Sequence, residues 1–225
     1  MRDSRLMREM FRAVAPRYDL ITRIFSFGMD RRWKALGVSR ALLRDDAVVL
    51  DLASGTGDFS DLVLRHRPQA KVIAMDLTEP MLHLARMRGQ GNVVCGDATI
   101  LPFADASFDC VFSGYGLRNF PDLNAAVREI GRVTRPKGLM VSLDFFLPEN
   151  PVLRWFYLGY LYLQGAFWGA LLHANPRTYT YIPDSLRSFL SIRDLSSLLR
   201  QRGYAHVEAR SYIFGGIGLH WAVKE

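Results

Sequence analysis

The chain has 225 residues, of which 49% are hydrophobic and 23% charged, and its formal net charge is +7. This length suits one well-filled domain, and this composition is that of a globular protein rather than of a disordered or fibrous one. Two cysteines exclude a disulfide scaffold, and residues 1–12 lack the apolar run of a signal peptide, so we expect a cytoplasmic protein with reduced thiols.

The excess positive charge lies in residues 1–44, which contain eleven Lys and Arg but only four Asp and Glu. Such a segment is attracted to an anionic surface, and a solvated helix face is the alternative interpretation. Interleaved apolar residues favour an amphipathic lid that contacts a lipid surface: Phe11, Ile21, Ile24, Phe25, Phe27 and Trp33. We find no helix-turn-helix, zinc or RNA-binding signature, so we expect no nucleic-acid partner.

Strands and helices alternate along the next part of the chain. Short apolar runs predict strands over 47–52, 71–75, 92–95, 108–113 and 138–145, with helices over 58–66, 79–88 and 123–134. This rhythm predicts parallel β-α-β units, in which ligands bind at the carboxyl ends of the strands.

The end of the chain has a different pattern. Residues 205–213 and 217–223 predict two strands joined by a short turn over 214–216, which indicates a hairpin. The predicted fold is therefore α/β, a Rossmann-like and mostly parallel sheet with a C-terminal antiparallel hairpin. Class I S-adenosylmethionine-dependent methyltransferases have this arrangement, whereas a dehydrogenase sheet would continue in parallel.

A glycine-rich turn follows the first predicted strand and opens a helix. Gly55 and Gly57, with Thr56 between them, permit a tight turn and a close approach of a ligand to the backbone. The nicotinamide fingerprint needs a third glycine at position 60, where this chain has Ser60. The turn therefore favours S-adenosylmethionine over a dinucleotide.

Two further strand ends carry acids. Asp76 is placed to accept the ribose hydroxyls, and Asp97, beside the Ala98 amide, to accept from the adenine amine. A helix cap is the alternative role for each acid. Three such motifs on successive strands indicate a nucleoside-cofactor site, and we include Ser113, at the end of the fourth strand, among its candidate residues.

Several motifs in order resemble those of the C-methyltransferases of ubiquinone and menaquinone biosynthesis, over nearly the whole chain. They lie at residues 18–19, 26–28, 31–33, 50–58, 101–103, 116–119 (Gly-Leu-Arg-Asn), 179–186 and 218–220. The chain departs from the family pattern at Thr22 (usually Asn), Asp30 (His), Lys137 (Gly) and Asp144 (Glu). None of these departures touches the cofactor loop, but they leave the quinone substrate open.

The resemblance implies methyl transfer to a ring carbon of a prenylated quinol, either demethylmenaquinol or a polyprenyl-benzoquinol. It implies that Arg118 acts on the substrate, with Asn119 positioning the ring, and we favour electrostatic stabilisation of a quinolate because guanidinium is a poor base. A surface salt bridge is the alternative for Arg118. Tyr18 is expected to orient the substrate or close over the cofactor, and a core aromatic is its alternative.

Other functions stay open at this point. They are a methyltransferase for another hydrophobic small molecule, a cofactor-binding subunit without activity, and a nicotinamide oxidoreductase, which Ser60 disfavours. The five histidines show no metal-ligand spacing, so we expect no metal.

An uncharged apolar stretch over 155–172 reaches the lower limit for a membrane span. Spanning is disfavoured because the final hairpin must return to the sheet. We expect a single domain over 1–225, with a lid over 1–44 and an apolar insertion over 151–190. The stretch is expected to be a buried helix pair or, as we favour, a wall for a prenyl tail that associates peripherally with the inner face of the membrane. A homodimer is kept as a hypothesis.

Overall fold

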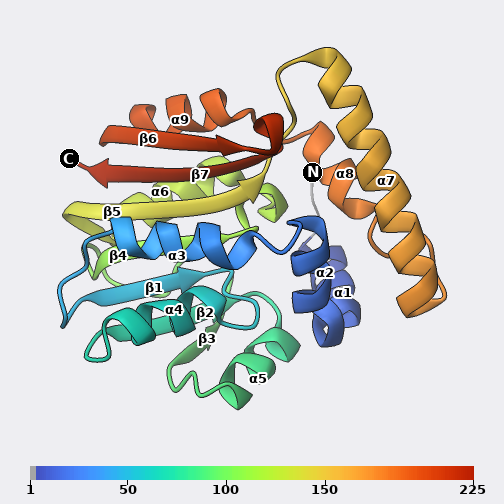
Figure 1. Ribbon diagram of the computed structural model, residues 1–225. Helices are drawn as coiled ribbons and strands as arrows, with labels where there is room; N and C mark the ends of the chain where they lie inside the picture. The colour runs from blue at the N-terminus through green and yellow to red at the C-terminus, as the bar shows by residue number, and fades with distance from the viewer. Residues whose placement is uncertain (1–3) are drawn as a thin grey trace.

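One seven-stranded sheet organises the chain, in the order β3-β2-β1-β4-β5-β7-β6. The computed structural model describes residues 4–225, with side chains from Met7 onward; Arg2, Asp3 and the side chain of Arg5, which contribute to the basic segment, lie outside the described residues. The strands are β1 (Val48–Leu52), β2 (Lys71–Asp76), β3 (Val93–Cys95), β4 (Phe108–Gly114), β5 (Thr134–Phe145), β6 (Tyr204–Tyr212) and β7 (Ile217–Lys224). Strands β1 to β5 pair in parallel, and β7 is antiparallel to both β5 and β6 (Figure 1). This topology confirms the predicted fold class.

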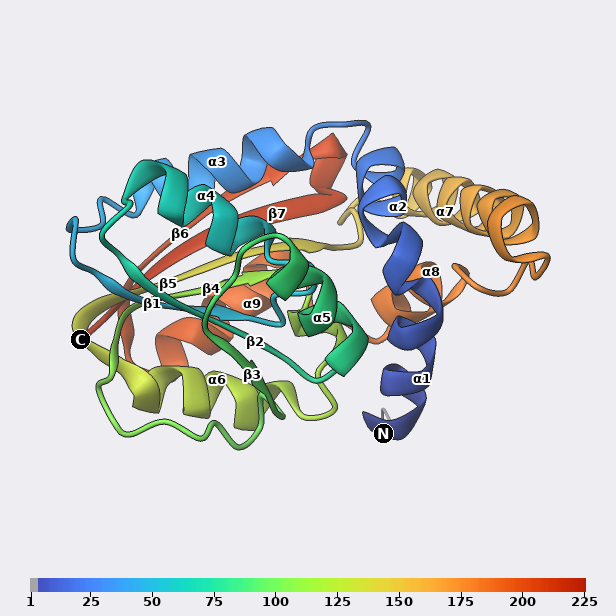
Figure 2. The ribbon, with the colours of Figure 1, turned by 90° about the horizontal axis from the view of Figure 1, so that it is seen from below.

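Helices cover both faces of the sheet. Helices α3 (Asp30–Arg40) and α4 (Asp58–His66) lie on one face, and α6 (Leu123–Val133) and α9 (Ile192–Gln201) lie on the other (Figure 2). Helix α5 (Glu79–Met87) packs on β2 and β3. Each predicted helix of the β-α-β region is confirmed to within one residue.

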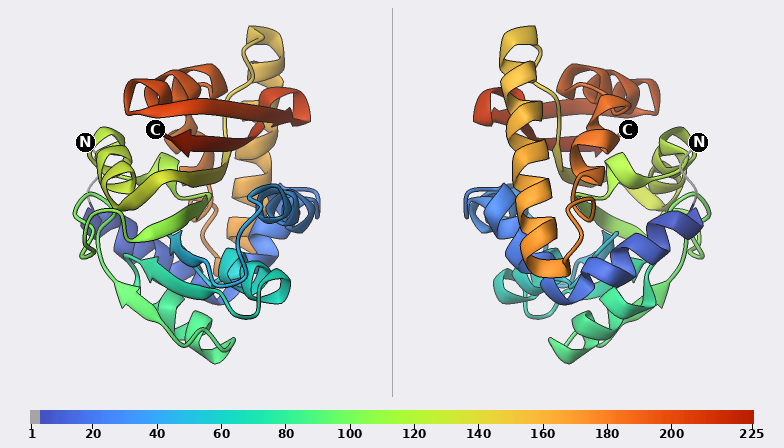
Figure 3. Two further views of the ribbon diagram at one scale, coloured as in Figure 1. Left: turned by 90° about the vertical axis from the view of Figure 1, so that its left-hand side faces the viewer. Right: turned by 90° about the vertical axis from the view of Figure 1, so that its right-hand side faces the viewer.

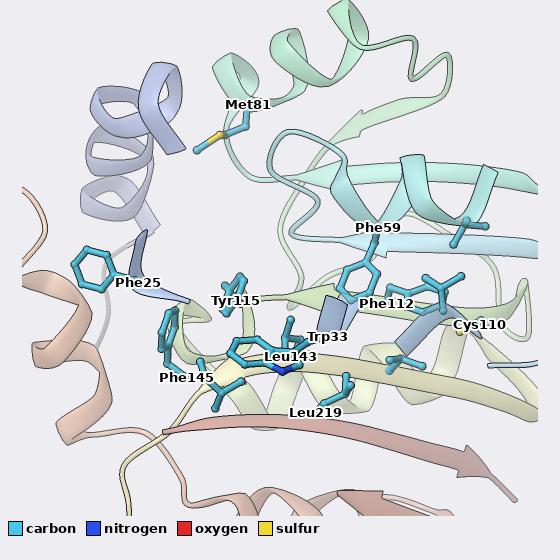
Figure 4. Close-up of a cluster of buried hydrophobic side chains, with 14 of the residues drawn as sticks. Phe25, Trp33, Phe59, Met81, Cys110, Phe112, Tyr115, Leu143, Phe145 and Leu219 are labelled. Atoms are coloured by element: carbon cyan, nitrogen blue, oxygen red, sulfur yellow. The ribbon is translucent and has the colours of Figure 1, made fainter. Parts of the chain in front are cut away.

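A buried apolar cluster fills the space between the sheet and the α3–α4 layer (Figure 4). Phe59 of α4 stacks on Phe112 of β4, with ring centroids 4.9 Å apart, and Trp33 of α3 is buried beside them. A Cβ atom at Gly37 would lie 3.3 Å from Val141 Cγ1, so this glycine lets α3 approach the sheet closely.

Four helices gather beyond the carboxyl ends of the parallel strands (Figures 1 and 3). They are α1 (Ser4–Val14), α2 (Tyr18–Phe25), α7 (Pro151–His173) and α8 (Tyr181–Arg187). Single 3-10 turns, η1 (Ala15–Arg17) and η2 (Leu117–Asn119), lead into α2 and follow β4. Helices of the basic N-terminal segment and of the segment over 151–190 therefore meet at the edge of the sheet where parallel α/β folds bind ligands, whereas α3 of the same basic segment covers a face of the sheet.

Strand boundaries differ from the predicted ones in two places. Strand β5 begins at Thr134, four residues earlier than predicted, because Thr134 pairs with Phe108 before a register shift in the ladder. The turn of the C-terminal hairpin is the 3-10 turn η3 (Ile213–Gly215), with Phe214 at a positive φ of 53°. The early start of β5 has no sequence signal, because the local apolar run ends before the bulge. The hairpin turn lies one residue before its predicted position.

The apolar stretch lies in one 23-residue helix, α7, so the alternative of a buried helix pair is wrong. Cβ atoms at Gly165 and Gly169 would lie 3.1 Å and 2.6 Å from backbone atoms of the segment that follows the helix, so these glycines let that segment fold back against it. Large apolar side chains of α7 remain exposed: Val152, Leu153, Trp155, Phe156, Leu163, Phe167 and Leu171. Within residues 4–225, no helix is long and apolar enough to cross a membrane.

Candidate active site

Hydrogen bonds connect the helix that follows the glycine-rich turn to the strand that precedes it. Asp51, near the end of β1, accepts hydrogen bonds from the Ser60 backbone N–H and hydroxyl at 2.9 and 2.7 Å, both to Oδ2. Burial raises the pKa of Asp51 to about 6, and the bonds from Ser60 oppose that rise. Ser60, which the sequence marked only as a missing glycine, therefore anchors the first turn of α4.

Asp76 connects the turn to the end of β2. Its Oδ2 accepts the Gly55 N–H at 2.9 Å and its Oδ1 accepts the Thr78 N–H at 2.8 Å. Each carboxylate oxygen has a second acceptor position, so the side chain can also receive two hydroxyl groups. The backbone of Gly55 has a φ of +55°, which glycine adopts without strain.

Asp97 follows β3 in a tight polar turn. Its Oδ1 accepts both the N–H and the hydroxyl of Thr99, at 2.8 and 2.7 Å. At the adjacent Gly96 a Cβ atom would meet the Cε atom of Met75 at 2.5 Å, so a larger residue here would require the end of the Met75 side chain to shift. Ala98 is buried next to Asp97.

Gly55, Asp76, Asp97 and Ala98 line one open cavity, in which the space between atoms is about 680 Å³ with the solvent at its mouth included. Its lining includes Phe11, Tyr18, Leu52, Ala53, Gly55, Met75, Asp76, Leu77, Thr78, Met81, Gly96, Asp97, Ala98, Gly114, Tyr115, Gly116, Asn119, Phe120 and Pro121. Two acids lie at successive strand ends among apolar side chains. A Cβ atom at Gly116 would lie 2.6 Å from Ala53 Cβ, so glycine is needed for these two segments of the cavity wall to pack this closely. The cavity fits a nucleoside with an apolar base pocket, as S-adenosylmethionine requires.

Three candidate cofactor residues lie outside this lining. Thr56 is buried and donates its hydroxyl to Asp19 Oδ1 at 2.8 Å, and Gly57 starts α4 with a φ of +87°. Ser113 is buried in β4, and its hydroxyl has no partner among the described residues. Direct cofactor contact by these three residues stays a prediction.

The Gly-Leu-Arg-Asn run forms η2 directly after β4. Arg118 is 3% exposed and pairs with the fully buried Asp144, Nη1 to Oδ1, at 2.7 Å. This is a buried ion pair, so the predicted alternative of a surface salt bridge is wrong. Asn119 lines the cavity and donates to the Tyr115 carbonyl at 3.1 Å, while its Oδ1 has no partner among the described residues.

Tyrosine side chains surround the guanidinium of Arg118. Tyr18, at the start of α2, lines the cavity, and a Cβ atom at Gly55 would lie 3.5 Å from its ring. Burial raises the pKa of Tyr18 and of Tyr181 of α8, and in both cases Arg118 opposes the rise. Tyr181 was not among the predicted site residues, although it lies within the 179–186 motif. Asp144 was noted in the sequence only as a departure from the family pattern, although it is an acid near a strand end.

Ion pairs tie the lid to the cofactor loop. Lys34 of α3 is buried and bonds to Asp58 at 2.5 Å and to Asp30 at 3.2 Å. Arg88 bonds to Asp58 and also to Asp19 of α2, which in turn accepts from the Thr56 hydroxyl. The basic N-terminal segment is therefore connected to Thr56 within the glycine-rich turn and to Asp58 after it.

The described part of the chain contains no group of three or more His, Cys, Asp or Glu side chains arranged to hold a metal ion. Of the five histidines, His220 is buried and contacts the Ile192 carbonyl at 3.1 Å, and burial lowers its pKa to about 4. At neutral pH this imidazole is therefore uncharged.

Comparisons with known proteins agree with this geometry. The family model described as "ubiE/COQ5 methyltransferase family" matches residues 1–224. The "Ubiquinone/menaquinone biosynthesis C-methyltransferase UbiE" of Desulfotalea psychrophila is 38% identical over 220 residues, which are 96% of this chain and 89% of that protein. The "Demethylmenaquinone methyltransferase" of Deinococcus radiodurans is 36% identical over 95% of this chain and 90% of its own length.

Solved structures share the fold. A methyltransferase of Haloferax volcanii, solved in complex with the Trm112 methyltransferase activator, has a TM-score of 0.68 at 18% identity and covers 95% of this chain and 97% of its own. A SAM-dependent methyltransferase of Thermotoga maritima has a TM-score of 0.63 at 20% identity, over 96% of this chain and 100% of its own. At these identities the likeness shows the class I methyltransferase fold.

Proposed function

Because the chain belongs to the ubiE/COQ5 methyltransferase family, we propose that it transfers the methyl group of S-adenosylmethionine to a ring carbon of a prenylated quinol. The acceptor is demethylmenaquinol or a polyprenyl-benzoquinol, the two ring classes that the names of its relatives suggest. The observation that carries the choice of a quinol is the buried guanidinium of Arg118, surrounded by tyrosines beside the cavity.

S-adenosylmethionine, when bound, supplies a methyl group on a positively charged sulfur, which an electron-rich carbon attacks. Asp76 holds the ribose hydroxyls, and Asp97 with the Ala98 amide holds the adenine edge. Gly55 and Gly116 keep the backbone close to the ligand. All five residues line the same cavity, which supports this assignment.

The acceptor ring needs electron density on the carbon next to a hydroxyl. Loss of that hydroxyl's proton to solvent supplies the density, and a nearby cation favours the deprotonated form. The proton on the ring carbon that gains the methyl group then returns to the ring oxygen, which restores the aromatic quinol. Arg118 is the buried cation beside the cavity, and Asn119 and Tyr18 line the wall that a ring would face. We assign Arg118 to stabilising the quinolate, with Asn119 and Tyr18 positioning the ring in a site shielded from water.

We place the prenyl tail and the membrane on the side of the molecule formed by α7. An apolar groove between α7, the α2–α3 loop and the hairpin turn is lined by Phe27, Pro148, Leu153, Phe156, Tyr157, Tyr160, Ile213 and Phe214. Phe214 is 82% exposed and Trp155 71%. Exposed aromatics of this kind insert into the headgroup region, and the net positive charge of residues 1–44 attracts anionic lipid. We therefore propose peripheral association with an anionic membrane surface; a homodimer remains the competing use of this face.

Methyl transfer from labelled S-adenosylmethionine tests the proposal. Reduced demethylmenaquinone and a prenylated benzoquinol are offered separately in liposomes, and we expect label on the ring carbon of one of them. Arg118→Ala should lower kcat by about a hundredfold or more with nearly unchanged cofactor affinity, because an interaction of the transition state is lost. Label on neither ring, with cofactor binding intact, would refute the quinol assignment and turn attention to another hydrophobic acceptor or to a subunit without activity.

A further inference from the structure

We propose that Asp144 is a positioning residue of the methyl-transfer site, which fixes the Nη1 side of the Arg118 guanidinium and leaves its Nε donor free for the oxygen of the acceptor. The inference rests on the proposed function, in which Arg118 stabilises a quinolate. It extends that function to a residue on a different strand, which would act only through Arg118.

One carboxylate holds both the backbone and the side chain of Arg118. Asp144 Oδ1 accepts from Arg118 Nη1 at 2.7 Å, and Oδ2 accepts from the Arg118 backbone N–H at 3.2 Å. The Phe145 backbone N–H donates to Oδ1 at 2.8 Å. Because the backbone bond fixes η2 and the side-chain bond fixes the guanidinium, a shift of Asp144 would move the whole of Arg118.

The guanidinium uses its donors unequally. Nη1 donates to Asp144 and also to the Tyr115 carbonyl, at 2.7 Å each, which commits both of its hydrogens. Nε is buried and has no partner among the described residues. Tyr181 of α8 also interacts with the guanidinium. A buried donor without an acceptor is costly, so the unpaired Nε indicates an acceptor supplied by a ligand.

The pair stands on a rigid part of the fold. Asp144 lies near the end of β5, between β4 and β7 in the sheet, opposite Gly218 of β7. The ring of Phe145 lies under the guanidinium, with its centroid 5.2 Å from Arg118 Cζ. These contacts leave the guanidinium little freedom to tilt, as a transition-state donor requires.

The negative charge of Asp144 should also affect the pKa of an acceptor hydroxyl bound beside Arg118. Its carboxylate offsets the positive charge of Arg118, and replacing it by an amide leaves that charge uncompensated. The other titratable groups that face the guanidinium are tyrosine hydroxyls, which burial keeps protonated: Tyr18, Tyr115, Tyr157 and Tyr181. Asp144→Asn should therefore lower the pKa of an acceptor hydroxyl bound beside Arg118.

The first test compares Asp144→Asn and Asp144→Glu with Ser142→Ala, a control on the same face of β5 whose hydroxyl has no partner among the described residues. Asp144→Asn should lower kcat by about a hundredfold, since misplacement by about 1 Å has that effect, and should leave the Kd of S-adenosylmethionine within about twofold. The acid limb of the kcat–pH profile should move to lower pH. Asp144→Glu should restore the wild-type limb and most of kcat, and Ser142→Ala should resemble the wild type.

A purely structural role would lower kcat without moving the acid limb, and would lower cofactor affinity as well; that result would overturn the proposal. So would an Asp144→Asn enzyme with wild-type kcat while Arg118→Ala is inactive. If the wild type methylates no quinol, or if Arg118→Ala keeps its activity, the proposed function fails instead.

A second test does not depend on the stability of Asp144→Asn. Arg118→Ala leaves a buried carboxylate facing an empty space, and millimolar guanidinium chloride should occupy it and restore activity at least tenfold. The double variant Arg118→Ala/Asp144→Asn lacks both charges, which costs less than leaving one unpaired, and guanidinium should not restore it. Equal rescue of both variants, or rescue of neither, would refute the role of Asp144.

Discussion

At the scale of single residues, Asp76 combines a structural and a binding role. Its two oxygens already fix the backbone of Gly55 and Thr78, and the same carboxylate faces the cavity. Asp76→Ala should weaken S-adenosylmethionine binding by about tenfold to a hundredfold, because hydrogen bonds to a charged acceptor contribute about 1.5–3 kcal/mol. Isothermal titration calorimetry measures the change directly.

The control for that prediction is Asp46→Ala, which removes a carboxylate that is 72% exposed and paired with Arg44 at the surface. It should leave the Kd unchanged. Equal affinity of Asp76→Ala and wild type would mean that the ribose hydroxyls bind elsewhere.

Asp51 should make stability depend on pH in a defined direction. Burial raises the pKa of its carboxyl from 3.8 to about 6 in the folded chain, so between these values the folded state binds the proton more tightly than the unfolded state. The contribution of Asp51 to the free energy of unfolding therefore rises as pH falls, by about 1 kcal/mol between pH 7 and pH 5.

Asp51→Asn isolates this effect, because asparagine can still accept from Ser60 but does not titrate. Denaturant unfolding of both proteins at pH 7 and pH 5 cancels the groups that they share. The free energy of unfolding of the wild type, relative to that of Asp51→Asn, should be higher at pH 5 than at pH 7. The same difference at both pH values would show that folding does not raise the pKa of Asp51.

At the scale of elements, α7 contains a matched pair of glycines. A Cβ atom at Gly169 would lie 2.6 Å from the Asn175 carbonyl oxygen, whereas one at Gly159 meets nothing within 4 Å. Gly169→Ala should destabilise the protein by about 1–3 kcal/mol, because backbone must move. Gly159→Ala should stabilise it by about 0.5–1 kcal/mol through helix propensity. Thermal unfolding of the two variants measures both signs; equal effects would mean that the packing of α7 against residues 174–180 contributes nothing.

Helix α7 also shows where sequence patterns stop being informative. The strands and helices from β1 to β5 could be predicted because each has a local apolar pattern, and each strand ends at or beside a glycine or an acid. The stretch over 155–172 is apolar all round, so no period distinguished one long helix from two short ones. Two of its glycines, Gly165 and Gly169, mark the face on which the following segment lies.

At the scale of the whole molecule, some residues of the candidate site could be predicted from local sequence and others could not. Gly55, Asp76 and Asp97 could be predicted because each lies at the end of its own strand or within three residues of it, and parallel strands end at one edge. The partner of Arg118 could not, because Asp144 comes 26 positions later and reaches it only through the pairing of β4 with β5. The links between Asp19, Arg88 and the cofactor loop likewise depend on how the lid packs.

The exposed apolar face provides the last prediction, on membrane association. Phe156 and Phe214 are 62% and 82% exposed and line one groove, although they are far apart in sequence. Phe156→Asp and Phe214→Asp should each lower binding to anionic vesicles by about tenfold, because inserting an aromatic side chain contributes about 1.5–3 kcal/mol. Ile100→Asp, at a residue that is 77% exposed near β3, is the control and should bind like wild type. Higher ionic strength should weaken the binding of all four proteins, since the net charge of residues 1–44 is screened. Vesicle binding that none of the substitutions changes would exclude this face, and a dimer that the Phe156→Asp substitution dissociates would show that a second copy covers it instead.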